Sequence, residues 1–131
     1  MRLFLYIYIL MGFLNNFIDR FNKAEFTIAP NKKLKTLSKE FAENFNLGLV
    51  FYKGNMIADG DLTLKKLNDK TSMDIQTSSS EELLLKANMT IGDVEKSFEQ
   101  VYGVKVQIKD NTLSKLVPNK ITLGQASREE Y

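Results

Sequence analysis

The chain carries one pattern of residues twice, and this repeat constrains its fold more than any other feature. When residues 25–54 are placed on residues 82–111 without a gap, Glu25 falls on Glu82 and Phe41 on Phe98. The apolar positions match better than the identities do; in the first copy they are Phe26, Ile28, Leu34, Leu37, Phe41, Phe45, Leu47, Leu49 and Phe51. After a two-residue insertion, Leu62-Thr63-Leu64 falls on Ile121-Thr122-Leu123. Matching periodicity over this length indicates one small unit that occurs twice.

Each copy predicts the same order of elements: strand, helix, strand, hairpin and short helical turn. Residues 26–28 alternate apolar and polar, as a half-buried strand does. The first helix has apolar residues at i, i+3, i+7 and i+11, the stripe of a helix that lies on a sheet. The second strands, Leu47–Lys53 and Val104–Lys109, alternate again. The order predicts an α+β fold with two βαββ-type units.

Turn and cap residues mark the ends of these elements. Gly54-Asn55 and Asp110-Asn111 are pairs that close tight hairpins. Thr90 with Asp93 three residues later predicts a capping box at the second helix. Asp61 and Asn119 stand just before the short apolar turns, and residues 72–77 predict one further strand.

The N-terminal residues predict an amphipathic helix. Residues 3–14 carry no charge, but this run is shorter than the ~20 residues that a membrane-spanning helix needs. Phe13, Phe17 and Phe21 recur at helical spacing and share one face with Leu14 and Ile18. That face can pack on the domain, lie on a membrane surface or fit a groove of a partner. We expect a cytoplasmic protein, with peripheral attachment to a membrane through this segment left open.

Composition excludes several classes of chemistry. The chain has 131 residues, a net charge of +2, and no cysteine or histidine. Disulfides, zinc–thiolate sites and thiol catalysis are therefore excluded, and the commonest general base is missing. Asp59 and Asp61 flank a turn glycine, where we expect Asp59 to bond the turn backbone and Asp61 to cap the following turn. We expect no catalytic, cofactor-binding or metal-binding residue, and no small-molecule substrate.

The first copy resembles the ubiquitin-like β-grasp family. The residues that carry the resemblance are Leu49–Asp59 followed by Leu62-Thr63-Leu64, together with Thr27-Ile28-x-Pro30 upstream. The second copy is similar but weaker, because Pro118-Asn119 replaces the acidic turn, and the whole resembles small bacterial tandem-repeat proteins. The resemblance implies three parts: residues 1–24 with the amphipathic helix, a first β-grasp-like repeat over 25–71, and a second over 72–131. The second repeat lacks room for a last strand, so either it is incomplete or the two copies share one sheet.

Two surfaces are candidates for binding. On the outer face of the second strand, Val50 and Tyr52 stand where the second copy has Gln107 and Lys109, so this face needs a cover. The N-terminal phenylalanine face, the other copy, a second subunit or a protein partner can supply it. Lys32, Lys33, Lys35 and Lys39 gather near the start of the first helix and predict a solvated face or a weak contact with an anionic surface.

These observations favour a non-catalytic protein-interaction or scaffold protein built from tandem ubiquitin-like units. A protein partner or self-association is expected at the Val50 and Tyr52 face. The alternative is a membrane-associated protein held by the N-terminal helix. The small net charge argues against nucleic acid as a partner, and nothing in the motifs points to an enzyme.

Overall fold

The computed structural model describes residues 25–69 and 81–131 and has the expected mixed α+β class. The first half contains β1 (Glu25–Ile28), α2 (Leu34–Phe45), β2 (Gly48–Lys53), β3 (Met56–Ile57) and α3 (Leu64–Asp69). The second half contains β4 (Leu83–Lys86), α4 (Ile91–Tyr102), β5 (Lys105–Lys109) and α5 (Leu123–Ser127). The predicted N-terminal helix with Phe13, Phe17 and Phe21, and the predicted strand over 72–77, lie outside the described residues.

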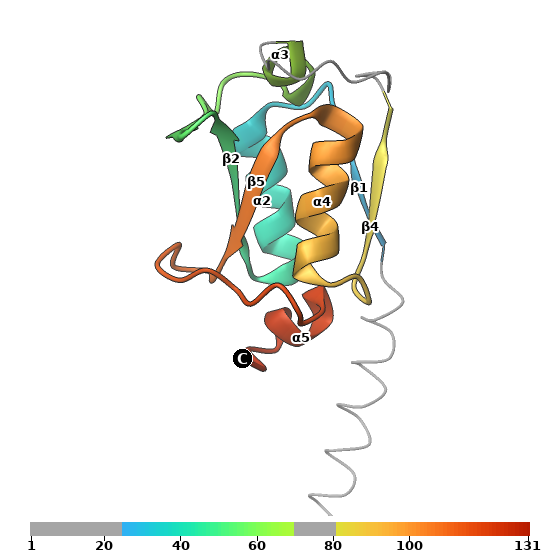
Figure 1. The fold of residues 1–131 in the computed structure, drawn as a ribbon, viewed down its shortest axis with the longest axis vertical. Coiled ribbons are helices and arrows are strands. Elements are labelled where there is room, and N and C mark those ends of the chain that lie inside the picture. Colours follow the sequence, from blue (N-terminus) through green and yellow to red (C-terminus); the bar gives the residue numbers. More distant parts are fainter. Residues whose placement is uncertain (1–24, 70–80) are drawn as a thin grey trace, which may run out of the picture.

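The two long helices lie between two small antiparallel sheets (Figure 1). One sheet has the order β3-β2-β5 and the other pairs β1 with β4. Helix α2 packs against β1 and β2, whereas α4 packs against β4 and β5. The apolar stripes of both helices are fully enclosed; they consist of Leu34, Leu37, Phe41, Phe45, Ile91, Val94, Phe98 and Tyr102. A single core therefore forms from residues of both halves.

The strands of one half pair mainly with strands of the other half. In the described residues, the one pairing of named strands within a half is the short β2–β3 hairpin. The second copy was expected either to be incomplete or to share one sheet with the first; in the structure, two sheets combine strands from the two halves. The second half also departs from the expected βαββ order, because only an isolated bridge between Lys109 and Leu116 stands where the hairpin strand after Asp110-Asn111 was expected.

The centres of the two sheets show the same spacing as the sequence repeat. Thr27 pairs with Leu84 in one sheet and Val50 pairs with Gln107 in the other. In both pairs the two residues are 57 positions apart, the offset between Glu25 and Glu82. The neighbouring pairs then run symmetrically outward, as they do around a two-fold axis.

The same backbone contacts hold the start of each long helix. Leu34 donates its N–H to the carbonyl of Leu62 over 2.8 Å, and Ile91 donates to Ile121 over 2.8 Å. In the next pair, the N–H of Lys35 binds Gly60 and that of Gly92 binds Asn119, each over 3.0 Å. A helix leaves its first N–H groups unpaired unless neighbours accept them. The loops before α3 and α5 supply these acceptors.

The cap of α3 differs from the one expected. Thr63 rather than Asp61 caps α3, since its Oγ1 accepts from the N–H of Lys66. Thr122 caps α5 and forms a complete capping box with Gln125. A threonine places its hydroxyl within reach of the first-turn N–H groups from the position directly before the helix.

Two other local predictions were correct in part. Thr90 caps α4 by accepting from the N–H of Asp93, as predicted, although no reciprocal bond from the Asp93 side chain is seen.

Gly54 adopts a φ of 62° in the β2–β3 turn, which suits a residue without Cβ. The predicted tight turn at Asp110-Asn111 is instead a longer loop that returns at Lys115, because the Asp110 carboxylate accepts from the N–H groups of Ser114 and Lys115.

Tyr102, at the end of α4, replaces the phenylalanine that ends α2. Its side chain is fully buried, and its hydroxyl donates to the carbonyl of Glu81 over 2.5 Å. Burial raises the pKa of Tyr102 to about 12, and the negative charges of Glu81 and Glu82 act in the same direction. The folded protein therefore favours the neutral phenol.

We expect stability to fall at high pH because of Tyr102. The folded pKa lies above the ordinary value of 10.0, so the stabilisation is present below pH 10 and is lost as the pH rises toward 12. The loss is at most about 3 kcal/mol. Tyr102→Phe removes the contacts of the hydroxyl with the carbonyls of Glu81 and Ile28, which costs on the order of 1 kcal/mol at pH 8, but it also removes this alkaline loss. Denaturant unfolding at pH 8 and pH 11 measures both effects, with Tyr52→Phe as the matched control. A Tyr102→Phe variant whose stability falls as steeply as that of the wild type contradicts the assignment.

Candidate functional site

The outer face of the three-stranded sheet carries Val50 and Tyr52 as expected. Leu49 and Phe51 point into the core, so the alternate residues of β2 point outward. The Tyr52 hydroxyl donates to Oε1 of Gln107 over 2.8 Å, and Nζ of Lys105 lies 5.8 Å from the ring centroid. Both Val50 and Tyr52 stay partly exposed. The polar residues of β5 thus cover part of this face and leave the rest open.

Three further apolar side chains extend this outer face. Ile57 pairs with Tyr52 and Leu116 pairs with Lys109, which places both on the outer side, where they are 68% and 59% exposed. Leu113 is 54% exposed and lies against Gly48, where a side chain would collide with it. We call Val50, Tyr52, Ile57, Leu113 and Leu116 the outer apolar patch. In the alignment of the two halves, Ile57 falls on Leu116. This match could have predicted that both apolar residues occupy equivalent places on the sheet.

A groove of about 530 Å³ runs between α2 and β2 and shares Val50, Ile57 and Leu113 with this patch. Ser38, Lys39 and Ala42 line it from the helix, and Leu47 and Leu49 line it from the strand. The loop at Gly60, packed on Lys35, bounds one end, and Leu113 bounds the other. Leu113 holds a φ of 62°, which is rare for a residue other than glycine and could not be predicted from the sequence.

The edge of β2 in this groove has backbone donors without acceptors. The N–H of Ala58 binds the carbonyl of Phe51, so Phe51 and Leu49 direct their backbone groups away from β5. β3 pairs only with Tyr52 and Lys53. The Leu49 carbonyl accepts from Oγ of Ser38 over 2.7 Å. Within residues 25–69 and 81–131, the N–H groups of Leu49 and Phe51 have no partner.

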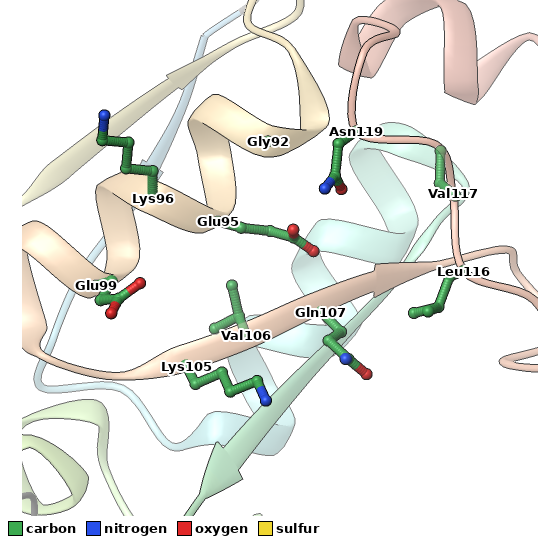
Figure 2. Close-up of a pocket in the computed structure, with 10 residues that line it drawn as sticks. All are labelled: Gly92, Glu95, Lys96, Glu99, Lys105, Val106, Gln107, Leu116, Val117 and Asn119. Atoms are coloured by element: carbon green, nitrogen blue, oxygen red, sulfur yellow. The ribbon is translucent and has the colours of Figure 1, made fainter.

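A second groove, of about 370 Å³, lies at the equivalent place between α4 and β5 (Figure 2). Here Glu95 extends from α4 toward β5 and accepts from the N–H of Ile108 over 3.2 Å. Burial raises the pKa of Glu95, although the Ile108 N–H and Lys105 favour its charged form. Glu95 is the counterpart of Ser38 in the repeat. The two grooves therefore share a position and differ in chemistry.

The four lysines of the predicted anionic contact do not form one cluster of free charges. Lys32 pairs with Glu40 at 2.8 Å and Lys35 pairs with Asp61 at 2.7 Å. The Lys35 ammonium, through its hydrogen bond and charge, holds the pKa of Asp61 below its usual value. Lys33 forms a bridge with Thr63 through its backbone, and Lys39 lines the α2–β2 groove.

The aspartates around Gly60 have structural partners. The Asp59 carboxylate accepts from the N–H of Asp61 over 3.0 Å, as expected of a turn residue. The Asp61 carboxylate binds Lys35 instead of capping the next turn. Over the described part of the chain, no group of three acidic side chains is placed to hold a metal ion.

Comparison with protein-family models, with curated proteins and with solved structures found no match. Among the helices formed by residues 25–69 and 81–131, none has the length and apolar character needed to cross a membrane.

We expect the amides of Leu49 and Phe51 to exchange with solvent faster than those of Val50 and Tyr52, which point toward β5. The difference should reach about two orders of magnitude or more, because an unpaired amide needs no opening of the sheet before it exchanges. Hydrogen exchange followed by NMR measures each amide, and Ile108, whose N–H is bound by Glu95, is the matched control. Equal protection of Leu49 and Val50 contradicts the open edge.

Proposed function

We propose that this protein is a non-catalytic protein-interaction protein made of two ubiquitin-like units, and that it binds a partner through the outer apolar patch. The observation that carries the proposal is the exposure of Ile57, Leu113 and Leu116 on one sheet face beside Val50 and Tyr52. Exposed apolar side chains grouped on one face are typical of protein-binding surfaces. Tyr52 adds a rigid aromatic ring with a polar tip, the kind of side chain enriched at interfaces.

The contacts that recur in both halves support the tandem units. Backbone bonds recur at aligned positions, 57 apart before the two-residue insertion and 59 apart after it; examples are the donors Leu34, Lys35, Leu64, Lys65 and Ala58 in the first half and Ile91, Gly92, Leu123, Gly124 and Val117 in the second. Phe41 and Phe98 are both fully buried, and each stacks at a tilt on the aromatic ring four residues later. If one unit was duplicated, the same backbone bonds and ring contacts are expected in both halves.

The order of elements supports the ubiquitin-like assignment for each unit. Strand, long helix, strand and short helix follow one another in both halves, with the hairpin strand β3 in the first. The buried positions of the long helices agree between the halves, and buried Leu64 and Leu67 of α3 match buried Leu123 and Ala126 of α5. Pairing of β1 with β4 and of β2 with β5 then supplies strand neighbours that a single unit lacks.

The absence of histidine and cysteine from the chain supports a non-catalytic role. Of the carboxylates described, Glu95 is held by a backbone N–H, and Asp59 and Asp61 bind a turn and a lysine. These partners give each group a structural task.

Site-specific photo-crosslinking tests the proposal. A full chain with a photoreactive phenylalanine in place of Tyr52 should give a discrete adduct in the source cells, to another protein or to a second copy. A chain with the same group at Glu43, on the exposed side of α2, is the control and should give none. Ile57→Asp should reduce the Tyr52 adduct severalfold, because a charge in an apolar contact must be desolvated. No adduct from position 52, or equal adducts from both positions, contradicts the proposal.

A further inference from the structure

We propose that the α2–β2 groove binds an extended, acidic segment of the partner, which adds to the free edge of β2 as another strand. This inference rests on the proposed function and names the chemistry of the partner at one site. It uses three observations: two backbone donors without partners among the described residues, a groove whose charged lining residues are all lysines, and an equivalent twin groove in which Glu95 occupies the corresponding donor.

The free donors set the backbone geometry of the ligand. The N–H groups of Leu49 and Phe51 are two residues apart on one strand edge, which spaces them by about 7 Å. An extended peptide presents carbonyls on one side at the same spacing, so it can satisfy both donors. Ser38 already occupies the Leu49 carbonyl. This edge of β2 therefore offers mainly hydrogen-bond donors to a ligand. Addition of a peptide as a further strand is a common mode of peptide recognition.

The charges at the groove determine which charge the side chains of the ligand should carry. Lys35, Lys39 and Lys109 line it, and no aspartate or glutamate does. Lys35 is shared with Asp61, whereas Lys39 and Lys109 have no ion-pair partner among the described residues. In the twin groove, Glu95 and Glu99 stand among the lysines. An acidic segment is the complement of the first groove alone.

The apolar lining favours alternation along the ligand. Successive side chains of an added strand point to opposite sides. One side would contact Ala42, Leu47 and Leu49, and the other would face solvent and the lysines. A sequence that alternates branched apolar and acidic residues fits both sides.

The twin groove indicates how the first can be closed. Glu95 places a carboxylate on the N–H of Ile108, the counterpart of the free Phe51 donor. Ser38, its counterpart on α2, bonds the Leu49 carbonyl instead. A Ser38→Glu substitution should therefore bring a carboxylate to the Phe51 N–H and repel an acidic ligand. Asn44→Glu adds the same charge at an exposed position of α2 that does not line the groove, so it is the matched control.

The test is an NMR titration of the full chain with two blocked heptapeptides, one of alternating Glu and Val and one of alternating Lys and Val. The acidic peptide should shift the amides of Leu49 and Phe51 and slow their exchange, while the basic peptide binds at least about tenfold more weakly. Ser38→Glu should lose about tenfold or more in affinity, and Asn44→Glu should stay within about twofold of the wild type. The spectra report whether each variant is folded.

Absence of shifts at Leu49 and Phe51 with the acidic peptide at about 1 mM overturns the inference, and so does equal binding by the two glutamate variants. The crosslink at position 52 separates this failure from failure of the proposed function. An adduct that persists unchanged in Ser38→Glu leaves the outer apolar patch as the binding surface and removes the groove. Loss of the adduct in Ser38→Glu but not in Asn44→Glu supports the groove.

Discussion

Hydrogen bonding between strands of different halves is the interaction on which the rest of this structure depends. A strand that lacks a neighbour leaves its backbone N–H and C=O groups unpaired, and a lone two-stranded hairpin is at best marginally stable. Among the described residues, β1 has no strand neighbour within its own half, and neither has β4 or β5. Only the pairs β1–β4 and β2–β5 close the core around α2 and α4. The centres of these pairs, Thr27–Leu84 and Val50–Gln107, fix where the two halves meet.

Pairing at the centre leaves each half with an equivalent groove at its outer strand edge, and the two grooves have diverged. Glu95 closes one edge through the Ile108 N–H, whereas Ser38 leaves the Phe51 N–H of the other edge free. The proposed duplication thus accounts for both the similarity of the grooves and their difference. One half would then serve mainly to complete the sheets, and the other would present the open edge and the lysines.

The sequence predicts the long elements well because burial repeats with a clear period. Phe41 and Phe98 stand on stripes that the structure encloses fully, and the alternation in β2 places Val50 and Tyr52 outward as expected. A sheet shared between the halves was predicted only as one alternative, and the strand pairs were not predicted, since periodicity identifies the buried face of a strand but not its neighbour. The exposure of Leu113 depends on a left-handed backbone at that residue and a bare Gly48, which no local pattern specifies. The free donors of Leu49 and Phe51 follow from the short reach of β3.

The central claim is that two equivalent halves complete each other's sheets. Separate preparation of fragments 25–71 and 72–131, followed by circular dichroism and sedimentation of each fragment and of their mixture, tests it most directly. Neither fragment should form a folded monomer, because its strands lack partners, and an equimolar mixture should regain helix and unfold cooperatively. A 25–71 fragment that is monomeric, folded and cooperative on its own would contradict the account.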